Sequence, residues 1–240
     1  MTDTLSRPLA ERVSQLKAVS APAEQKPIPS GAVAGAIQAL ADGKTHYTTR
    51  PGIVPLREKV SEQLKHDYQL DIAVDDITIT CGIQEAEFVA LKKLATPSSQ
   101  VLYTDNEDGS VADYLQGFVP LLEFSLTDTP NNPDKINVLY IGASSPNLAD
   151  WLQMALTHNW WIIWNTRLYD ASSMISQDEN LASRTVLTGT FEDQLPGWAV
   201  GWMAGSEMAG QLRSYKQSMT ICSPSISQWA AYGMVNNHAE

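Results

Sequence analysis

Short apolar segments that alternate with helical stretches are the feature of this chain that most constrains its fold. From residue 76 onward, seven short runs are rich in β-branched and aromatic side chains. Apolar residues at helical spacing fill most of the intervals between them. This alternation is typical of an α/β fold, with a mostly parallel sheet covered by helices on both faces. The expected strands are 77–80, 101–104, 121–126, 137–142, 160–164, 184–189 and 200–205, and the expected helices between them are 84–95, 110–117, 148–158 and 206–219.

The sequence before the first strand is helical, with a proline-rich stretch inside it. Residues 1–30 predict an N-terminal arm and linker, in which a short helix over 8–20 precedes three prolines. Two further helices are expected over 32–41 and 54–68. We therefore expect an arm at 1–30 and a single domain over 31–240.

The charge and composition exclude several classes of partner. The chain carries 16 basic and 27 acidic residues, a net charge of −11, so a nucleic-acid partner is not expected. No apolar stretch has the length of a membrane span. Cys81 and Cys222 are too few for a disulfide framework, which favours a cytoplasmic protein. The four histidines are scattered, so no metal site is expected.

Four segments carry a family pattern in a fixed order. They are GKTHYTTRPGIVPLREKVSEQLK (43–65), ITITCGIQEAEFVALKKL (77–94), SPN (145–147), and LPGWAVGWMAG (195–205) with CSPSISQWAA (222–231) after it. Together they resemble class I/II aminotransferases, the aspartate aminotransferase-like enzymes of fold type I that use pyridoxal phosphate. The resemblance implies a three-layer αβα fold with a mostly parallel, seven-stranded sheet, as in the large domain of these enzymes. It stops inside the last helix, so their small C-terminal domain is expected to be absent.

The resemblance implies a lysine that bonds covalently to the cofactor, and the sequence has none at that position. Counting back from Pro196 places the position at Phe191. Counting forward from the preceding strand places it at Glu192 or Asp193. No catalytic residue is therefore assigned. Lys216, the nearest lysine in sequence, is expected on the solvated face of the following helix.

Three other contacts that the family makes with its cofactor are also altered. Ala199 stands in place of the arginine that holds the phosphate, and Thr166 in place of the carboxylate that pairs with the pyridine nitrogen. Glu107 and Asp108 replace the stacking aromatic residues, and their charge opposes an anionic cofactor. We therefore expect no cofactor, or pyridoxal phosphate bound weakly and without a covalent bond.

Some residues match the family's cofactor site. Gly82 to Gln84 open a helix as the phosphate-binding turn does, and a helix N-terminus suits an anion. Tyr47 matches the tyrosine that reaches across a dimer to the neighbour's phosphate. The turn and the dimer seam could also account for their presence. The matching cofactor-site residues are Gly82, Ile83, Gln84, Tyr47, Tyr169 and Asn147.

These losses predict a degenerate aminotransferase-like protein without transaminase activity, acting as a dimeric binding or regulatory pseudoenzyme. The dimer would form with itself or with an active relative. One alternative is an enzyme of altered chemistry in amino-acid metabolism that binds pyridoxal phosphate or a small anion at residues 82–84. Another is a structural or assembly protein, which the seven tryptophans would suit. The acidic excess of residues 94–240, with 15 acidic and 5 basic side chains, is expected to mark the altered cofactor site.

Overall fold

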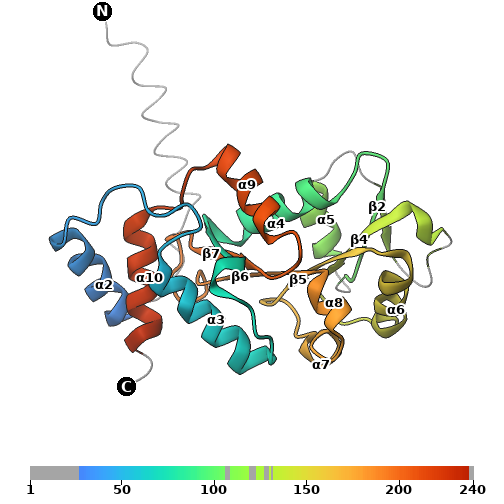
Figure 1. Ribbon diagram of the computed structural model, residues 1–240, viewed down its shortest axis with the longest axis horizontal. Coiled ribbons are helices and arrows are strands. Elements are labelled where there is room, and N and C mark those ends of the chain that lie inside the picture. The colour runs from blue at the N-terminus through green and yellow to red at the C-terminus, as the bar shows by residue number, and fades with distance from the viewer. Residues whose placement is uncertain (1–26, 106–108, 119–122, 127–129, 131, 238–240) are drawn as a thin grey trace, which may run out of the picture.

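The computed structural model describes residues 27–105, 109–118, 123–126, 130 and 132–237 (Figure 1). The predicted helix over 8–20 and the two acidic residues at 107 and 108 lie outside this range. In the described part of the chain, no helix is long and apolar enough to cross a membrane. No group of three or more metal-binding side chains is found among the same residues.

A seven-stranded sheet forms the centre of the molecule, in the order β1-β7-β6-β5-β4-β2-β3. The strands β2 to β6 run parallel, whereas β7 is antiparallel to both of its neighbours, β1 and β6. The predicted mostly parallel sheet is therefore confirmed. The strands are β1 (Ile77–Thr80), β2 (Gln100–Tyr103), β3 (Glu123–Leu126), β4 (Ile136–Ile141), β5 (Trp161–Asn165), β6 (Thr185–Thr190) and β7 (Gly201–Ala204).

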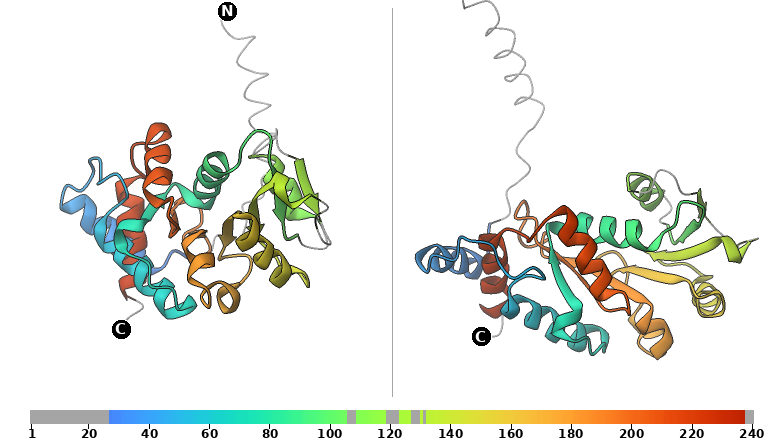
Figure 2. Two further views of the ribbon diagram at one scale, coloured as in Figure 1. Left: turned by 45° about the vertical axis from the view of Figure 1, so that its right-hand side comes forward. Right: turned by 45° about the horizontal axis from the view of Figure 1, so that its top comes forward.

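Helices cover both faces of the sheet, as the three-layer prediction requires (Figures 1 and 2). Alternate strand residues point to opposite faces, so Leu139 of β4 enters one core cluster and Tyr140 enters the other. One face packs against α4 (Gly82–Leu94), α5 (Ser110–Gln116) and α9 (Ala209–Met219). The other packs against α2 (Ser30–Ala41), α3 (Val54–Tyr68), α6 (Leu148–His158), α7 (Ser172–Ile175), α8 (Glu179–Ser183) and α10 (Ser225–Asn237). Two short 3-10 helices, η1 (Val74–Asp76) and η2 (Pro133–Lys135), precede β1 and β4.

The tryptophans belong to these cores. Trp151, Trp160, Trp164 and Trp202 are buried in the cluster on the α3 face, and the other three are partly buried against one of the two clusters. Aromatic side chains bury large apolar areas, so this placement stabilises the sheet–helix packing. The tryptophans therefore serve mainly in core packing.

The helices α2 and α10 pack unusually close together, side by side at one end of the sheet (Figure 1). A Cβ atom built on Gly35 of α2 would lie 2.4 Å from the carbonyl oxygen of Trp229. One built on Gly233 of α10 would lie 2.4 Å from the carbonyl oxygen of Gly31. Only glycine permits this approach of the two backbones. Val33, Ile37 and Leu40 of α2 remain exposed to solvent.

Candidate functional site at the carboxyl edge of the sheet

The turns that follow β1, β5 and β6 come together at one edge of the sheet. Thr80, the last residue of β1, and Thr190, the last of β6, both pair in register with Gly201 of β7. Asn165, the last residue of β5, pairs with Thr188 of β6. In open α/β sheets, ligands bind outside the carboxyl ends of the strands. This edge is therefore the candidate functional site.

The turn after β1 has the geometry that the sequence predicts. α4 begins at Gly82, whose φ of +81° lies in the left-handed region that favours glycine. Gly201 packs directly on it, because a Cβ atom on Gly201 would lie 2.5 Å from the carbonyl carbon of Gly82. Ile83 is buried and Gln84 is exposed. The three residues thus form the start of a helix at the edge of the sheet, and their role toward a cofactor stays a prediction.

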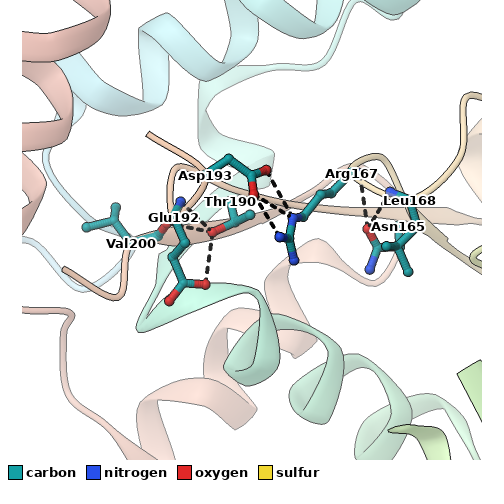
Figure 3. A network of polar contacts seen from close by, with 7 residues as sticks. All are labelled: Asn165, Arg167, Leu168, Thr190, Glu192, Asp193 and Val200. Carbon is teal, nitrogen blue, oxygen red and sulfur yellow. Dashed lines mark hydrogen bonds and ion pairs between the residues drawn. The ribbon is translucent and has the colours of Figure 1, made fainter. Parts of the chain in front are cut away.

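The position expected for the lysine holds three side chains that are engaged in other contacts, and Figure 3 shows two of them, Glu192 and Asp193. Phe191 is buried in the core cluster on the α3 face. The carboxylate of Glu192 lies over Gly82, with Oε1 3.2 Å from where a Cβ atom of that glycine would be. Thr190 holds it there, since its hydroxyl donates to Oε2 at 3.1 Å and accepts from the Glu192 amide at 3.0 Å. An acidic group of the chain itself therefore stands beside the first turn of α4.

Asp193, the third candidate, forms an ion pair with Arg167 from the turn after β5 (Figure 3). The Nε atom of Arg167 lies 3.0 Å from each carboxylate oxygen, and its Nη2 atom lies 2.7 Å from Oδ1. These hydrogen bonds raise the pKa of the guanidinium group. The two side chains are 47% and 56% exposed, so the pair contributes little to stability. It lines a groove of about 760 Å³ that reaches Tyr68 of α3.

In the turn after β5, Thr166 occupies the position where the family has the carboxylate that pairs with the pyridine nitrogen. The hydroxyl of Thr166 donates to the carbonyl oxygen of Thr188 at 2.9 Å. Tyr169 is partly buried, and its carbonyl oxygen accepts a hydrogen bond of 2.7 Å from the indole of Trp164. Thr166 thus ties β5 to β6 and adds no charge to the site.

Two residues that were expected to bind the cofactor, Asn147 and Tyr47, do not belong to the turns after β1, β5 and β6. Asn147 precedes the first residue of α6, where its carbonyl oxygen accepts from the Trp151 amide at 3.0 Å. Tyr47 is 81% exposed on the loop between α2 and α3, beside a hollow lined by Pro55 and Trp229. A single chain leaves this tyrosine pointing to solvent, so its contact across a dimer stays a prediction.

Lys216 is not solvated, and the prediction that places it on an exposed face is wrong. Its side chain is fully buried between α9 and α4, and its Nζ atom lies 3.8 Å from Oε2 of Glu85. Leu212, one turn earlier on α9, is also buried. Lys216 therefore continues the apolar face of this helix, and the acidic partner for it comes from α4.

A buried polar network was not expected from the sequence. Glu87 of α4 is fully buried, and its carboxylate accepts hydrogen bonds from Tyr114, Tyr140, Asn165 and Thr188. We call these five residues the Glu87 network. One signal was available, since this glutamate follows buried Ile83 and precedes buried Leu91 at helical spacing. An acid in the middle of an apolar helix face indicates buried polar partners.

The residues at this edge do not fit pyridoxal phosphate held through a lysine. That mode of binding needs an amine for the aldehyde and a neutral or positive surface for the phosphate. Phe191, Glu192 and Asp193 supply neither, and Ala199 adds no charge. The Glu192 carboxylate stands over Gly82, where it repels an anion. Lys216 is paired with an acid of α4 instead.

Curated proteins with similar sequences are aminotransferases. The chain is 30% identical to the (5-formylfuran-3-yl)methyl phosphate transaminase of Methanocaldococcus jannaschii, with 81% of this chain and 57% of that protein aligned. It is 25% identical to the aspartate aminotransferase of Thermotoga maritima, over 85% of this chain and 62% of the relative. The chain therefore spans about three fifths of the length of these relatives. No protein-family model matches it.

Solved structures agree on the fold. The aspartate aminotransferase from Thermus thermophilus with maleate superposes with a TM-score of 0.75 at 18% identity, covering all of this chain and 72% of that one. The aspartate aminotransferase from Thermotoga maritima gives a TM-score of 0.71 at 20% identity, with coverage of 98% and 72%. The chain is therefore homologous to the aspartate aminotransferase-like proteins and has the fold of their large domain.

Proposed function

We propose that this protein is a degenerate aminotransferase without transaminase activity, which acts as a dimeric binding or regulatory protein. The observation that carries the proposal is the turn after β6. Each residue at a position expected for the lysine makes another contact. Phe191 packs in the core, the Glu192 carboxylate lies over Gly82, and Asp193 forms an ion pair with Arg167. A transaminase needs an amine at this place both to bind the cofactor and to move protons.

The relatives are named as active aminotransferases, and their activity is the natural test. The purified protein is incubated with pyridoxal phosphate, aspartate and a 2-oxo acid, beside a known aspartate aminotransferase at equal concentration. We expect no turnover above the reaction without enzyme. Borohydride reduction followed by mass spectrometry is expected to find no lysine modified in a single, saturable way. Turnover, or stoichiometric labelling of one lysine, would contradict the proposal.

A second candidate function is a small-anion-binding enzyme of altered chemistry. The exposed Gln84 in the first turn of α4 favours it, because the N-terminus of a helix attracts negative charge. Calorimetric titration with pyridoxal phosphate and with inorganic phosphate separates the two candidates. Saturable binding below about millimolar concentration, lost in Gln84→Ala, would support this second function. If no saturable binding is found, the first candidate function, a protein without transaminase activity, remains.

The dimer is supported by the apolar surface of α2. Ile37 is 62% exposed and Leu40 is 56% exposed, and Tyr47 lies on the loop that follows. Exposed apolar groups of this kind mark surfaces that other proteins cover. Either a second copy or an aminotransferase relative would meet this surface, and both are part of the proposal.

A further inference from the structure

Helix α2 has a second apolar face, which is exposed to solvent. Its inner face packs against α10 through the glycine contacts described above. Val33, Ile37 and Leu40 follow one another at intervals of four and three residues, so they form one stripe along the helix. They are 41%, 62% and 56% exposed. None of the 12 residues of α2 is charged. A helix that is apolar on both faces is typical of a buried helix, so the outer stripe is expected to have a cover.

A segment with the same apolar pattern precedes α2 in the chain. The N-terminal segment, residues 8–20, lies outside the described residues. Its sequence carries Leu9, Val13 and Leu16, which are again four and three residues apart. Helices with apolar residues at this spacing pack along a common seam. Each stripe extends over about two turns of helix, so their lengths match. No like charges would meet between them, because α2 is uncharged.

The connection between the two helices is long enough for the N-terminal segment to fold back on α2. Residues 21–29 contain three prolines, and at about 3.1 Å per residue they can span about 28 Å. The 12 residues of α2 extend over only about 18 Å. A tether of this length gives the segment an effective concentration of about a millimolar beside α2. A second copy of the chain meets the same face only at the concentration of the protein itself, so the chain's own segment has the advantage.

We propose that residues 8–20 of the same chain cover the outer stripe of α2 as an antiparallel helix. The antiparallel direction follows from the connection, which joins the end of the segment to the start of α2. This arrangement pairs Leu16 with Val33, Val13 with Ile37, and Leu9 with Leu40. The N-terminal segment then controls access to this face, because any partner protein must displace it first. The inference goes beyond the proposed function and does not depend on the dimer.

Disulfide trapping in the full chain tests the contact. Val13→Cys and Ile37→Cys are introduced together, and the dilute protein is held in a glutathione redox buffer. We expect a disulfide between the two introduced cysteines in a chain that keeps the size of a monomer in non-reducing electrophoresis. Peptide mass spectrometry identifies this bond and separates it from any bond of the native cysteines. The control pair is Ser14→Cys with Ile37→Cys, since Ser14 lies on the opposite side of the segment, and it should give at least about tenfold less of the bond.

A charge placed in the N-terminal segment provides a second measurement. Val13→Asp is expected to release the segment from α2, because it would put a charge in an apolar contact. The exposed stripe should then bind more of the apolar dye anilinonaphthalene sulfonate, which raises the fluorescence of the dye. Ser14→Asp introduces the same charge on the opposite side and should leave the fluorescence at the level of the unaltered protein.

Three results would overturn the proposal. A disulfide between positions 13 and 37 that joins two chains would give the face to a second copy. A bond formed no better than that of the control pair would show that the segment does not lie on α2. If the cysteine variants fail to fold, equal dye fluorescence in Val13→Asp and Ser14→Asp decides against the contact. A protein that is monomeric in sedimentation would remove the proposed homodimer and leave this contact standing, so the two failures are distinguishable.

Discussion

Lys216 of α9 is fully buried and lies beside Glu85, a partly buried acid in the first turn of α4. Oε2 of Glu85 accepts from the backbone amide of Cys81 at 2.6 Å, and Oε1 accepts from the hydroxyl of Thr220. Nζ of Lys216 lies 3.8 Å from Oε2, with no hydrogen-bond partner among the described residues. The lysine therefore balances the charge of an acid that holds the first turn of α4. This pairing explains why a lysine can lie on an apolar helix face.

Removing one partner should be harmful, because it leaves the other charge buried and unpaired. Lys216→Met is expected to lower the free energy of unfolding by about 3 kcal/mol, measured by urea denaturation. The double variant Lys216→Met with Glu85→Gln should recover most of that loss. Lys93→Met, at an exposed position of α4, is the control and should change stability by less than about 0.5 kcal/mol. Equal effects of Lys216→Met and the control would show that the pair is not a stabilising contact.

Glu87 gives the stability a pH dependence of predictable sign. Burial raises its pKa in the folded state above the value of about 4.3 in the unfolded chain, so the folded state binds the proton more tightly. Its stabilising contribution is complete below about pH 4.3 and is lost as the pH rises through the raised pKa. Relative to Glu87→Gln, the unaltered protein should lose unfolding free energy over that rise. Glu58→Gln, at an exposed position of α3, should follow the unaltered protein, and an identical slope in Glu87→Gln would refute the linkage.

At the scale of elements, the turn after β6 places the carboxylate of Glu192 beside the first turn of α4. Helix α4 was expected to begin near residue 84 and begins at Gly82, because the positive φ of this glycine lets the chain turn directly from β1 into the helix. The strand and the helix could be predicted from local patterns. That Glu192 faces this turn could not, because the contact depends on β6 and β1 both flanking β7.

Neutralising Glu192 should make the start of α4 more attractive to anions. Glu192→Gln is expected to raise the affinity for inorganic phosphate about two- to fivefold, the effect of one charge at a helix N-terminus. Calorimetric titration at low ionic strength measures it, since salt screens the effect. Glu207→Gln makes the same change of charge at an exposed residue beyond β7 and should leave the affinity unaltered. No difference between the two variants would exclude control of this turn by Glu192.

The contact between α2 and α10 allows a cleaner test of packing. In Gly35→Ala the new methyl group meets the Trp229 carbonyl oxygen, so the helices must separate, and we expect a loss of about 1–3 kcal/mol of unfolding free energy. Gly210→Ala in α9 adds the same methyl group where nothing lies within 4 Å. It is expected to be neutral or to stabilise the protein by up to about 1 kcal/mol. Thermal unfolding of both variants measures the contrast, and equal effects would mean that the helices do not need the glycine.

For the whole molecule, the order of strands and helices follows from alternation that is visible in the sequence. Six of the seven expected strands occur within about two residues of their predicted bounds, because buried strands are short and apolar. In the seventh, 121–126, the first two residues lie outside the described part of the chain, and the rest form β3. The candidate site was harder to predict from the sequence than the fold. The loss of the lysine could be read directly at 191–193, whereas the burial of Glu87 and Lys216 depends on which helix faces meet in three dimensions. A residue's partner is set by the packing and is not encoded near it in the chain.

Self-association is the prediction that belongs to the whole molecule. If the exposed face of α2 is covered by a partner copy, Ile37→Glu should weaken the dimer at least about tenfold, because it places a charge in an apolar interface. Analytical ultracentrifugation over a range of concentrations measures the dissociation constant. Gln153→Glu introduces the same charge on exposed α6 and should leave it unchanged. An unaltered protein that stays monomeric throughout would rule out the homodimer and leave a partner of another kind.

The close packing of α2 against α10 also affects how the domain folds during synthesis. The two helices stand at opposite ends of the described chain, yet each provides the surface against which the other packs. During synthesis, α2 leaves the ribosome well before α10 and lacks this packing partner until α10 emerges. The sheet can begin to assemble earlier, since its parallel strands are added one after another. This domain is therefore expected to close only after α10 has been synthesised, with the apolar surface of α2 exposed until then.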